Sequence, residues 1–277
     1  MDYGAPVRFG CFLTPDATNS QRALELATLA DDLGFDLIGV QDHPYQRRFF
    51  DTWTLLTAIA MRTKRISVFP DVANLPLRPP AMLAKAAASL DLLTGGRVEL
   101  GLGAGGFWDA IKAIDGPVRT PGESVSALEE AIQVIRLMWS GERGLHFDGK
   151  FYRLNGAHSG PVPAHPIGIW VGAYKPRMLA LIGRLADGWV PSLGYLKQAD
   201  LAAANARIDE AAAAAGRDPS AIRRVLNVGD LTADAVAVLA LEHGFDTFVI
   251  GEDNLERFAS DVAPKVRELI AEGRGSR

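Results

Sequence analysis

The sequence predicts an α/β protein, a (β/α)₈ barrel with a small β-hairpin excursion between the fourth and fifth βα units. Three observations lead to this prediction. Short apolar runs alternate eight times with longer amphipathic segments, the length of 277 residues suits one such barrel, and the single long interruption carries a hairpin signal. A doubly wound sheet is the competing arrangement, because periodicity alone does not distinguish it from a barrel.

Eight short runs rich in Val, Ile and Phe are predicted to be buried parallel strands, because strands that are covered on both faces are apolar throughout. These runs are Val7–Leu13, Asp36–Gln41, Arg65–Val72, Val98–Leu102, Ile167–Gly172, Gly188–Pro191, Arg224–Val228 and Thr247–Ile250. Longer runs with apolar residues spaced three and four apart predict helices that pack one face on the strands. These helices are Ser20–Leu33, Thr52–Arg62, Pro79–Leu93, Pro121–Trp139, Pro176–Ala186, Gln198–Ala215, Thr232–His243 and Asn254–Ala271.

Local chemistry supports these boundaries. Thr120-Pro121-Gly122-Glu123 is a capping box with proline at the first helical position. The interruption spans Gly141–Pro166, and within it Asp148-Gly149 lies between two short apolar runs, which is a strong hairpin signal. We therefore expect an excursion rather than a domain boundary, and one domain over residues 1–277.

Composition excludes several classes of protein. The chain is 48% hydrophobic, which excludes a disordered protein, and its net charge of −4 argues against nucleic-acid binding. Cys11 is the one cysteine, so no intramolecular disulfide forms. No run approaches the roughly 18 apolar residues of a membrane span, and the N-terminus does not resemble a signal peptide. We expect a cytoplasmic protein that binds neither nucleic acid nor membranes.

Ligands of such folds gather at the carboxyl ends of the strands, so the residues that follow each strand are the candidates for function. The second strand is followed by Asp42 and His43. His43 is predicted to be a catalytic residue that handles a proton or polarises a ligand. Asp42 is a second catalytic candidate, with the alternative that it only holds its loop. The structural alternative for His43 is a helix cap or a partner for a carboxylate.

Two further loops have unusual composition. Four prolines between Pro70 and Pro80 stiffen the loop after the third strand, as suits ligand positioning. The fourth strand leads into Gly101-Leu102-Gly103-Ala104-Gly105-Gly106, which matches the dinucleotide fingerprint but in the wrong βα unit. The glycines still indicate a close approach of the backbone to something flat or bulky. Phe107 and Trp108 then offer either aromatic surface for a ligand or core packing.

The fifth strand predicts an anion site. Gly172, Ala173, Tyr174 and Lys175 precede a helix that begins at Pro176, and free backbone N–H groups at a helix N-terminus bind phosphate. The alternative is a plain turn with solvated basic side chains. The remaining histidines lack the spacing of metal ligands, so no metal site is expected.

These residues together resemble the luciferase-like oxidoreductase superfamily, whose members are TIM barrels that bind FMN or the deazaflavin coenzyme F420. The resemblance rests on the order and spacing of several segments along nearly the whole chain. These are Leu33–Asp36 leading to Asp42-His43, Arg78–Ala81, Ala86–Asp91, Gly95–Val98 leading to Gly101–Gly105, Gly122-Glu123, Leu128–Ala131, Trp139–Gly141 and Gly183–Trp189.

The resemblance implies a site. It places the cofactor ring over the barrel mouth, against Pro70, Asn74 and a non-proline cis peptide between Asp71 and Val72, and beside Gly105 and Gly106. It places the cofactor phosphate on the backbone of Gly172–Lys175. His43 matches the active-site histidine of the deazaflavin branch, and this favours F420 over FMN.

Two departures and one short loop qualify what the resemblance implies. Arg47 and Gly106 replace the aromatic residue and the carboxylate of the sugar-phosphate dehydrogenases, which argues against a sugar-phosphate substrate. The loop that follows Asn227 is short, which predicts a more open substrate pocket or a degenerate member.

We therefore expect an oxidoreductase that transfers a hydride between F420 and a small organic substrate. The alternatives are an FMN-dependent luciferase-like monooxygenase that works with a flavin reductase, and a non-catalytic flavin-binding protein. The expected partners are the small-molecule substrate, a second copy of the chain in a homodimer, and a flavin or F420 reductase.

Overall fold

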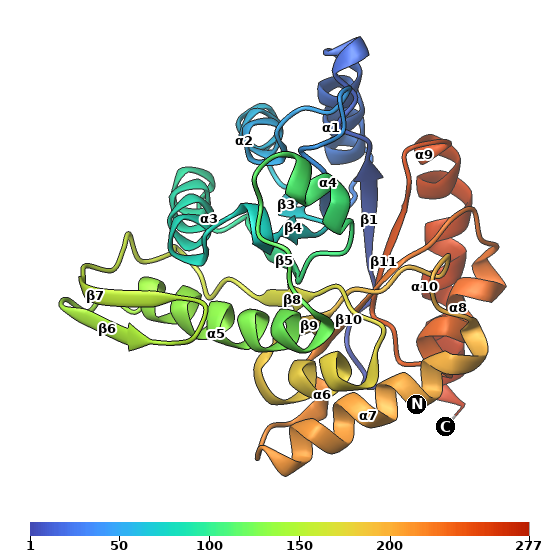
Figure 1. Ribbon diagram of the computed structural model, residues 1–277. Helices are drawn as coiled ribbons and strands as arrows, with labels where there is room; N and C mark the ends of the chain where they lie inside the picture. Colours follow the sequence, from blue (N-terminus) through green and yellow to red (C-terminus); the bar gives the residue numbers. More distant parts are fainter. Residues whose placement is uncertain (277) are drawn as a thin grey trace.

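A closed barrel of parallel strands forms the centre of the computed structural model, which describes residues 1–276 (Figure 1). Its nine strands follow the order β3-β2-β1-β11-β10-β9-β8-β5-β4, and each hydrogen-bonded neighbour is parallel. The barrel closes because Val68 donates to the Arg97 carbonyl at 2.9 Å and accepts from the Glu99 amide at 3.0 Å. The closure confirms the predicted barrel and excludes the doubly wound sheet.

All eight predicted strands are present, with one of them divided. The third is split into β3 and β4 on either side of Asp71 and Val72. The strands are β1 (Arg8–Leu13), β2 (Leu37–Val40), β3 (Ser67–Pro70), β4 (Ala73–Asn74), β5 (Leu100–Gly103), β8 (Ile169–Val171), β9 (Gly188–Trp189), β10 (Arg223–Asn227) and β11 (Thr247–Gly251).

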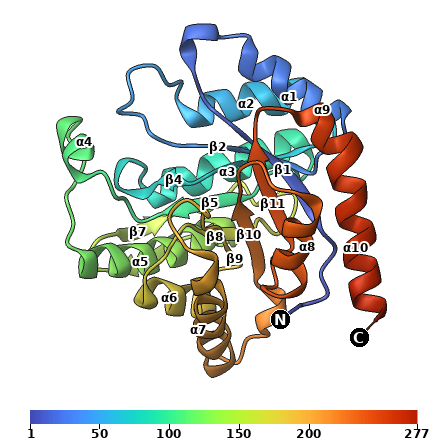
Figure 2. The ribbon, with the colours of Figure 1, turned by 90° about the vertical axis from the view of Figure 1, so that its right-hand side faces the viewer.

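Helices ring the strands on the outside, as the two orthogonal views show (Figures 1 and 2). They are α1 (Arg22–Asp32), α2 (Thr52–Arg62), α3 (Pro80–Thr94), α4 (Trp108–Ala113), α5 (Pro121–Trp139), α6 (Pro176–Leu185), α7 (Leu201–Ala214), α8 (Ala233–Leu241), α9 (Leu255–Arg257) and α10 (Ala263–Gly275). The bounds of α2 and α5 are those predicted, and the capping box of α5 is formed in both directions between Thr120 and Glu123. The last predicted helix is divided by a π-helical turn at Phe258–Val262, and the short α4 was not predicted.

The predicted hairpin excursion is present between the fourth and fifth βα units. It consists of β6 (Leu145–Asp148) and β7 (Arg153–Ala157), and it extends away from the barrel in Figure 1. The turn is fixed on α5, because Glu130 accepts hydrogen bonds from the amides of Lys150, Phe151 and Tyr152 at 2.9, 2.8 and 3.1 Å.

Two apolar layers stabilise the barrel. The larger lies between the strands and the helices. The smaller fills the barrel interior, because its side chains come from strands on all sides: Leu37, Phe69, Trp170, Val190, Val225 and Val249. Burial of such side chains is worth about 1.5–3 kcal/mol each. This interior layer forms the base on which the carboxyl end of the barrel is built.

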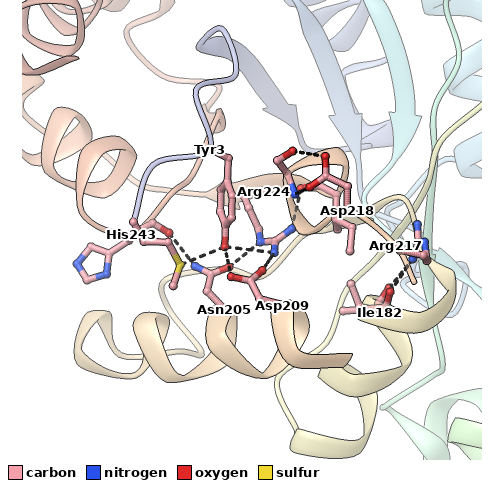
Figure 3. Close-up of polar contacts among 12 residues, drawn as sticks. Tyr3, Ile182, Asn205, Asp209, Arg217, Asp218, Arg224 and His243 are labelled. Carbon is pink, nitrogen blue, oxygen red and sulfur yellow. Dashed lines mark hydrogen bonds and ion pairs between the residues drawn. The ribbon is translucent and has the colours of Figure 1, made fainter. Parts of the chain in front are cut away.

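The amino end of the barrel is held by a buried cation (Figure 3). Arg224, at the start of β10, is fully buried, and its guanidinium donates to Asn205 at 2.6 Å and to Asp209 at 2.7 Å. The Tyr3 ring lies 4.9 Å from the same guanidinium. These contacts join the N-terminal segment, α7 and β10 at the end of the barrel opposite to the candidate site.

No helix in the part of the chain described here is both long enough and apolar enough to cross a membrane.

Candidate functional site

Polar side chains gather at the carboxyl end of the barrel, because every parallel strand ends on the same side. We call each of the eight predicted strands of the barrel a stave, so that β3 and β4 together are the third stave. The predicted residues lie at the carboxyl ends of four staves: Asp42 and His43 after β2, residues 70–74 where β3 passes into β4, Gly105 and Gly106 after β5, and residues 172–175 after β8. Ser192 after β9 and Asn227 in β10 join them, and neither was singled out in the sequence.

Asp42 is buried and paired within the protein. Its side chain is fully buried and accepts from Arg78 Nε at 2.6 Å and from Arg78 Nη2 at 2.7 Å. It also accepts the backbone amide of Asn74 at 2.8 Å. Both oxygens therefore have partners within the protein, which is the environment expected if Asp42 holds its loop.

His43 keeps one ring nitrogen free for chemistry. Nδ1 lies 2.6 Å from Tyr45 Oη, and the ring of Phe107 meets the imidazole edge to face at 5.4 Å. Burial lowers the pKa of His43 below its ordinary value, against a smaller opposing effect of Asp42, so the imidazole is neutral at neutral pH. Burial also raises the pKa of Tyr45 to about 12, so its hydroxyl stays protonated.

The hydrogen bond to Tyr45 allows two tautomers of His43. If Nδ1 carries the proton and donates to Tyr45 Oη, Nε2 has a lone pair and accepts a proton. If the tyrosine hydroxyl donates instead, Nε2 carries the proton of the neutral ring and can only donate a hydrogen bond. The first tautomer can therefore accept a proton at Nε2, and the imidazolium ion so formed can return it; Tyr45 was not identified from the sequence.

The third stave turns inward between its two strands. The peptide bond between Asp71 and Val72 is cis, as the resemblance implies. Val72 packs on glycines of two neighbouring strands: a Cβ on Gly103 would lie 2.7 Å from Val72 Cγ2, and one on Gly172 would lie 3.2 Å from it. These glycines leave the space that the turn of the third stave needs.

Asp71 and its neighbours form a polar layer directly above the apolar interior, which we call the floor (Asp71, Asn227, Ser192 and Tyr174). Asn227 Nδ2 donates to Asp71 Oδ1 and to Ser192 Oγ, both at 3.2 Å. The Ser192 amide donates to Tyr174 Oη at 3.2 Å. Burial raises the pKa of Asp71 to about 7, and the hydrogen bond from Asn227 offsets only part of this effect.

The glycine loop after β5 has two parts with different reasons for glycine. Gly105 has a φ of 95°, and a Cβ there would lie 2.7 Å from Pro76 and 2.8 Å from Trp108. The contacts with Pro76 and Trp108 therefore require glycine at position 105, whose backbone is exposed. Gly106 is exposed, with no atom within 4 Å of an added Cβ, so its backbone is open to a ligand.

The segment between β8 and α6 is fixed at its start and exposed at its end, since the Gly172 amide donates to the Leu102 carbonyl at 3.2 Å. Trp189 Nε1 donates to the Ala173 carbonyl at 2.9 Å, which fixes the turn from below. Lys175 precedes the first helical residue and its side chain does not cap the helix. Lys175 and Arg177 are exposed. The helix N-terminus and these two cations are available to an anion.

The carboxyl end fits a planar ring with polar edges. Buried oxygens of Asp71, Asn74 and Asn227 lack a hydrogen-bond partner, which native proteins rarely tolerate without a ligand or water. Two exposed aromatic side chains lie at the same end: Phe107, 58% exposed, beside His43, and Tyr195, 78% exposed, beside Tyr174. Within residues 1–276, no three His, Cys, Asp or Glu side chains gather as metal ligands do.

Fold and site together define a parallel barrel with polar and aromatic groups at its carboxyl end, which is the arrangement of barrel enzymes. The family model of the luciferase-like monooxygenases matches residues 2–234. The chain belongs to this family.

Two relatives extend the comparison. The chain is 31% identical over 248 residues to the F420-dependent glucose-6-phosphate dehydrogenase of Gordonia bronchialis, with 86% of this chain and 72% of that protein covered. It is 32% identical over 219 residues to the 5,10-methylenetetrahydromethanopterin reductase of Archaeoglobus fulgidus, with 79% and 62% covered.

One solved structure supports the fold. An F420-dependent secondary alcohol dehydrogenase, solved with an F420-acetone adduct, superposes with a TM-score of 0.82 at 19% identity. The match covers 94% of this chain and 99% of that one. It confirms the arrangement of strands and helices.

Proposed function

We propose that this chain is an F420-dependent oxidoreductase that transfers a hydride between F420 and a small organic substrate. The observation that carries the proposal is the imidazole of His43, positioned by Tyr45 and Phe107 at the mouth of a barrel in which Val72 packs on the interior layer. Family membership and the name of one relative, the F420-dependent glucose-6-phosphate dehydrogenase of Gordonia bronchialis, support the choice of cofactor.

Separate parts of the carboxyl end would hold the cofactor. The turn of the third stave (Pro70, Asp71, Val72 and Asn74) and the exposed backbone of Gly106 would contact the ring. The segment Gly172–Lys175 would bind the phosphate through those of its amides that have no partner within residues 1–276, with the Lys175 ammonium beside it. F420 supplies the ring carbon that accepts or releases the hydride.

His43 would move the proton that accompanies the hydride. When a substrate hydroxyl group is oxidised to a carbonyl group, the carbon loses a hydride and the oxygen loses a proton. Neutral His43 would accept that proton at Nε2, and it would return the proton when the reaction runs backward. The loop at residues 228–232 is short, so we propose that the substrate side of the mouth is open to molecules of varied shape.

Titration of the purified protein with F420 and with FMN tests this proposal. We expect F420 to bind with a Kd at least tenfold below that of FMN, measured by fluorescence quenching. Tight binding of FMN without binding of F420 would instead support the flavin monooxygenase, which needs a flavin reductase. F420 binding without turnover on any of a panel of alcohols and aldehydes would support a non-catalytic binder.

We also propose that the chain forms a homodimer. Met82 and Leu93 are 66% and 67% exposed on α3, and they lie about three helical turns apart on one face. Met61, 52% exposed, lies on the neighbouring α2. Light scattering on the protein eluted from a size-exclusion column is expected to give twice the mass of one chain. The M82E/L93E variant is expected to give the mass of one chain. A wild-type mass of one chain would contradict the dimer.

A further inference from the structure

Asp71 is a buried carboxyl group that lacks a charged partner. It is 8% exposed, and no ion pair within residues 1–276 includes it. Oδ1 accepts one hydrogen bond, from Asn227 at 3.2 Å, and the buried Oδ2 has no partner. Asp42 is just as buried but has a guanidinium and a backbone amide on its two oxygens. The two carboxyl groups therefore have opposite environments within one site.

Asp71 also lies where a ligand would cover it. Its amide donates to the Val40 carbonyl at 2.8 Å, and a Cβ on Gly39 would lie 3.1 Å from the Asp71 Cβ. Its carboxyl group reaches across the barrel from the third stave to Asn227 on β10. Phe69 and Trp170 close the interior below it. A ligand bound over the floor would therefore lie on the side of Asp71 opposite to this apolar layer.

We propose that Asp71 takes up a proton when the cofactor covers the mouth, so that this chain binds its cofactor together with one proton. The proposal rests on the proposed function, because it needs a ring bound over the floor. Burial of a carboxylate that accepts only one hydrogen bond is energetically unfavourable. A ring that covers the floor would bury Asp71 further and make its charged form less favourable still. The carboxylate therefore combines with a proton from solvent and becomes a neutral carboxylic acid.

The pKa values of the groups around Asp71 indicate that a change of affinity just above pH 7 comes from Asp71 itself. Asp71 itself has a pKa raised to about 7 by burial in the free protein. His43, on the loop after β2, has a pKa lowered below its ordinary value. Burial and the charge of Asp71 both raise the pKa of Tyr174 above 10. The other facing groups are Asp42, which is paired with Arg78, the hydroxyl of Tyr195, and the uncharged Ser192 and Asn227.

The affinity for F420 is expected to decrease as the pH rises. Asp71 has a higher pKa in the bound state than in the free protein, so the affinity is at its maximum below the pKa of Asp71 in the free protein, about 7. It falls as pH rises through that value, by about tenfold per pH unit, until the pKa of the bound state is reached.

Two measurements test the inference. Carboxyl ¹³C NMR of the ligand-free protein labelled at aspartate is expected to show one signal with a midpoint near pH 7 that is absent in Asp71→Asn. Calorimetric titration with F420 at pH 8, in phosphate and in Tris buffer, is expected to show uptake of nearly one more proton in the wild type than in Asp71→Asn. Proton exchange by F420 itself is common to both proteins and cancels in this difference.

Two control variants separate the inference from a merely structural role. Asp230→Asn removes an exposed carboxylate at the same end of the barrel and is expected to keep the wild-type uptake. Asn227→Leu removes the hydrogen bond that lowers the pKa of Asp71, so the NMR midpoint is expected to move to higher pH.

The outcomes also separate this inference from the proposed function. Binding of F420 with equal proton uptake in the wild type and in Asp71→Asn would overturn the inference alone. Failure of F420 to bind between pH 6 and 8 would overturn the proposed function and the inference with it. An Asp71 signal that titrates near pH 4 in the free protein would contradict the inference before any ligand is added.

Discussion

Replacement of His43 by alanine is expected to lower kcat by about 10²–10⁴-fold, the usual contribution of a general acid–base group. The imidazole is neutral, half-buried and held by Tyr45 at 2.6 Å, so it is ready to accept a proton without first losing one. F420 binding is expected to change less than threefold, because the proposed contacts to the cofactor come mainly from other staves. Steady-state kinetics and F420 titration of the same preparation measure the two effects.

The pH profile identifies the histidine more sharply than the rate does. Alcohol oxidation needs neutral His43, and its pKa is lowered by burial. The fall of kcat toward acid is therefore expected below the ordinary titration range of histidine, and it should be absent in His43→Ala. Asp71 is expected to affect the binding of F420 above pH 7, so its effect should appear in the KM for F420 rather than in kcat.

Two variants serve as controls for His43→Ala. His158 is exposed near the hairpin excursion, and His158→Ala is expected to keep the wild-type rate. Tyr45→Phe removes the hydroxyl that positions Nδ1 and is expected to lower kcat by about threefold to tenfold, in proportion to one lost hydrogen bond of about 0.5–1.5 kcal/mol. A rate for His43→Ala within threefold of the wild type would contradict acid–base catalysis by this residue.

Periodicity and local chemistry predicted the scaffold because both act over short stretches of chain. The helix Pro121–Trp139 has the predicted bounds, since its proline, capping box and apolar spacing all lie within it. The short α4 was missed because its six residues are too few for a helical period, and its position depends on Trp108 packing against Gly105.

The sequence predicted which residues follow each strand, but not which of them contact one another. His43 and Asp42 are adjacent in sequence, and no local signal shows that one stays free while the other binds a guanidinium 36 residues away. Asn227 is 156 residues from Asp71, and the hydrogen bond between them exists because the barrel closes. Partners separated by most of the chain depend on tertiary structure, so neither the floor nor the role of Asp42 follows from the sequence pattern.

The ion pair of Asp42 and Arg78 is expected to have the largest effect on stability. Arg78→Met leaves a fully buried carboxylate without its cation, and loss of one partner of a buried pair costs about 3–5 kcal/mol of unfolding free energy. Arg78 also donates to Asp51, the N-cap of α2, at 2.7 Å, so the same change weakens the start of that helix. Urea denaturation followed by circular dichroism measures the loss.

Matched variants distinguish the buried pair from a general effect of charge. Arg153 pairs with Asp148 on the surface, with side chains 76% and 90% exposed, and Arg153→Met is expected to cost at most about 1 kcal/mol. The double variant D42N/R78M is expected to be more stable than Arg78→Met, because it removes the charge that has lost its partner. A cost for Arg78→Met no greater than that for Arg153→Met would contradict the positioning role of Asp42.

The same pair connects stability to the site. Asp42 holds the amide of Asn74 at 2.8 Å, directly after the inward turn at Asp71 and Val72. Arg78→Met is therefore expected to weaken F420 binding even at urea concentrations where the protein remains folded. Arg78→Lys keeps the charge but not the two-pronged contact, so it should recover part of the stability and less of the affinity. Equal recovery of both would show that the positive charge of residue 78, rather than the geometry of its contact with Asp42, positions the third stave.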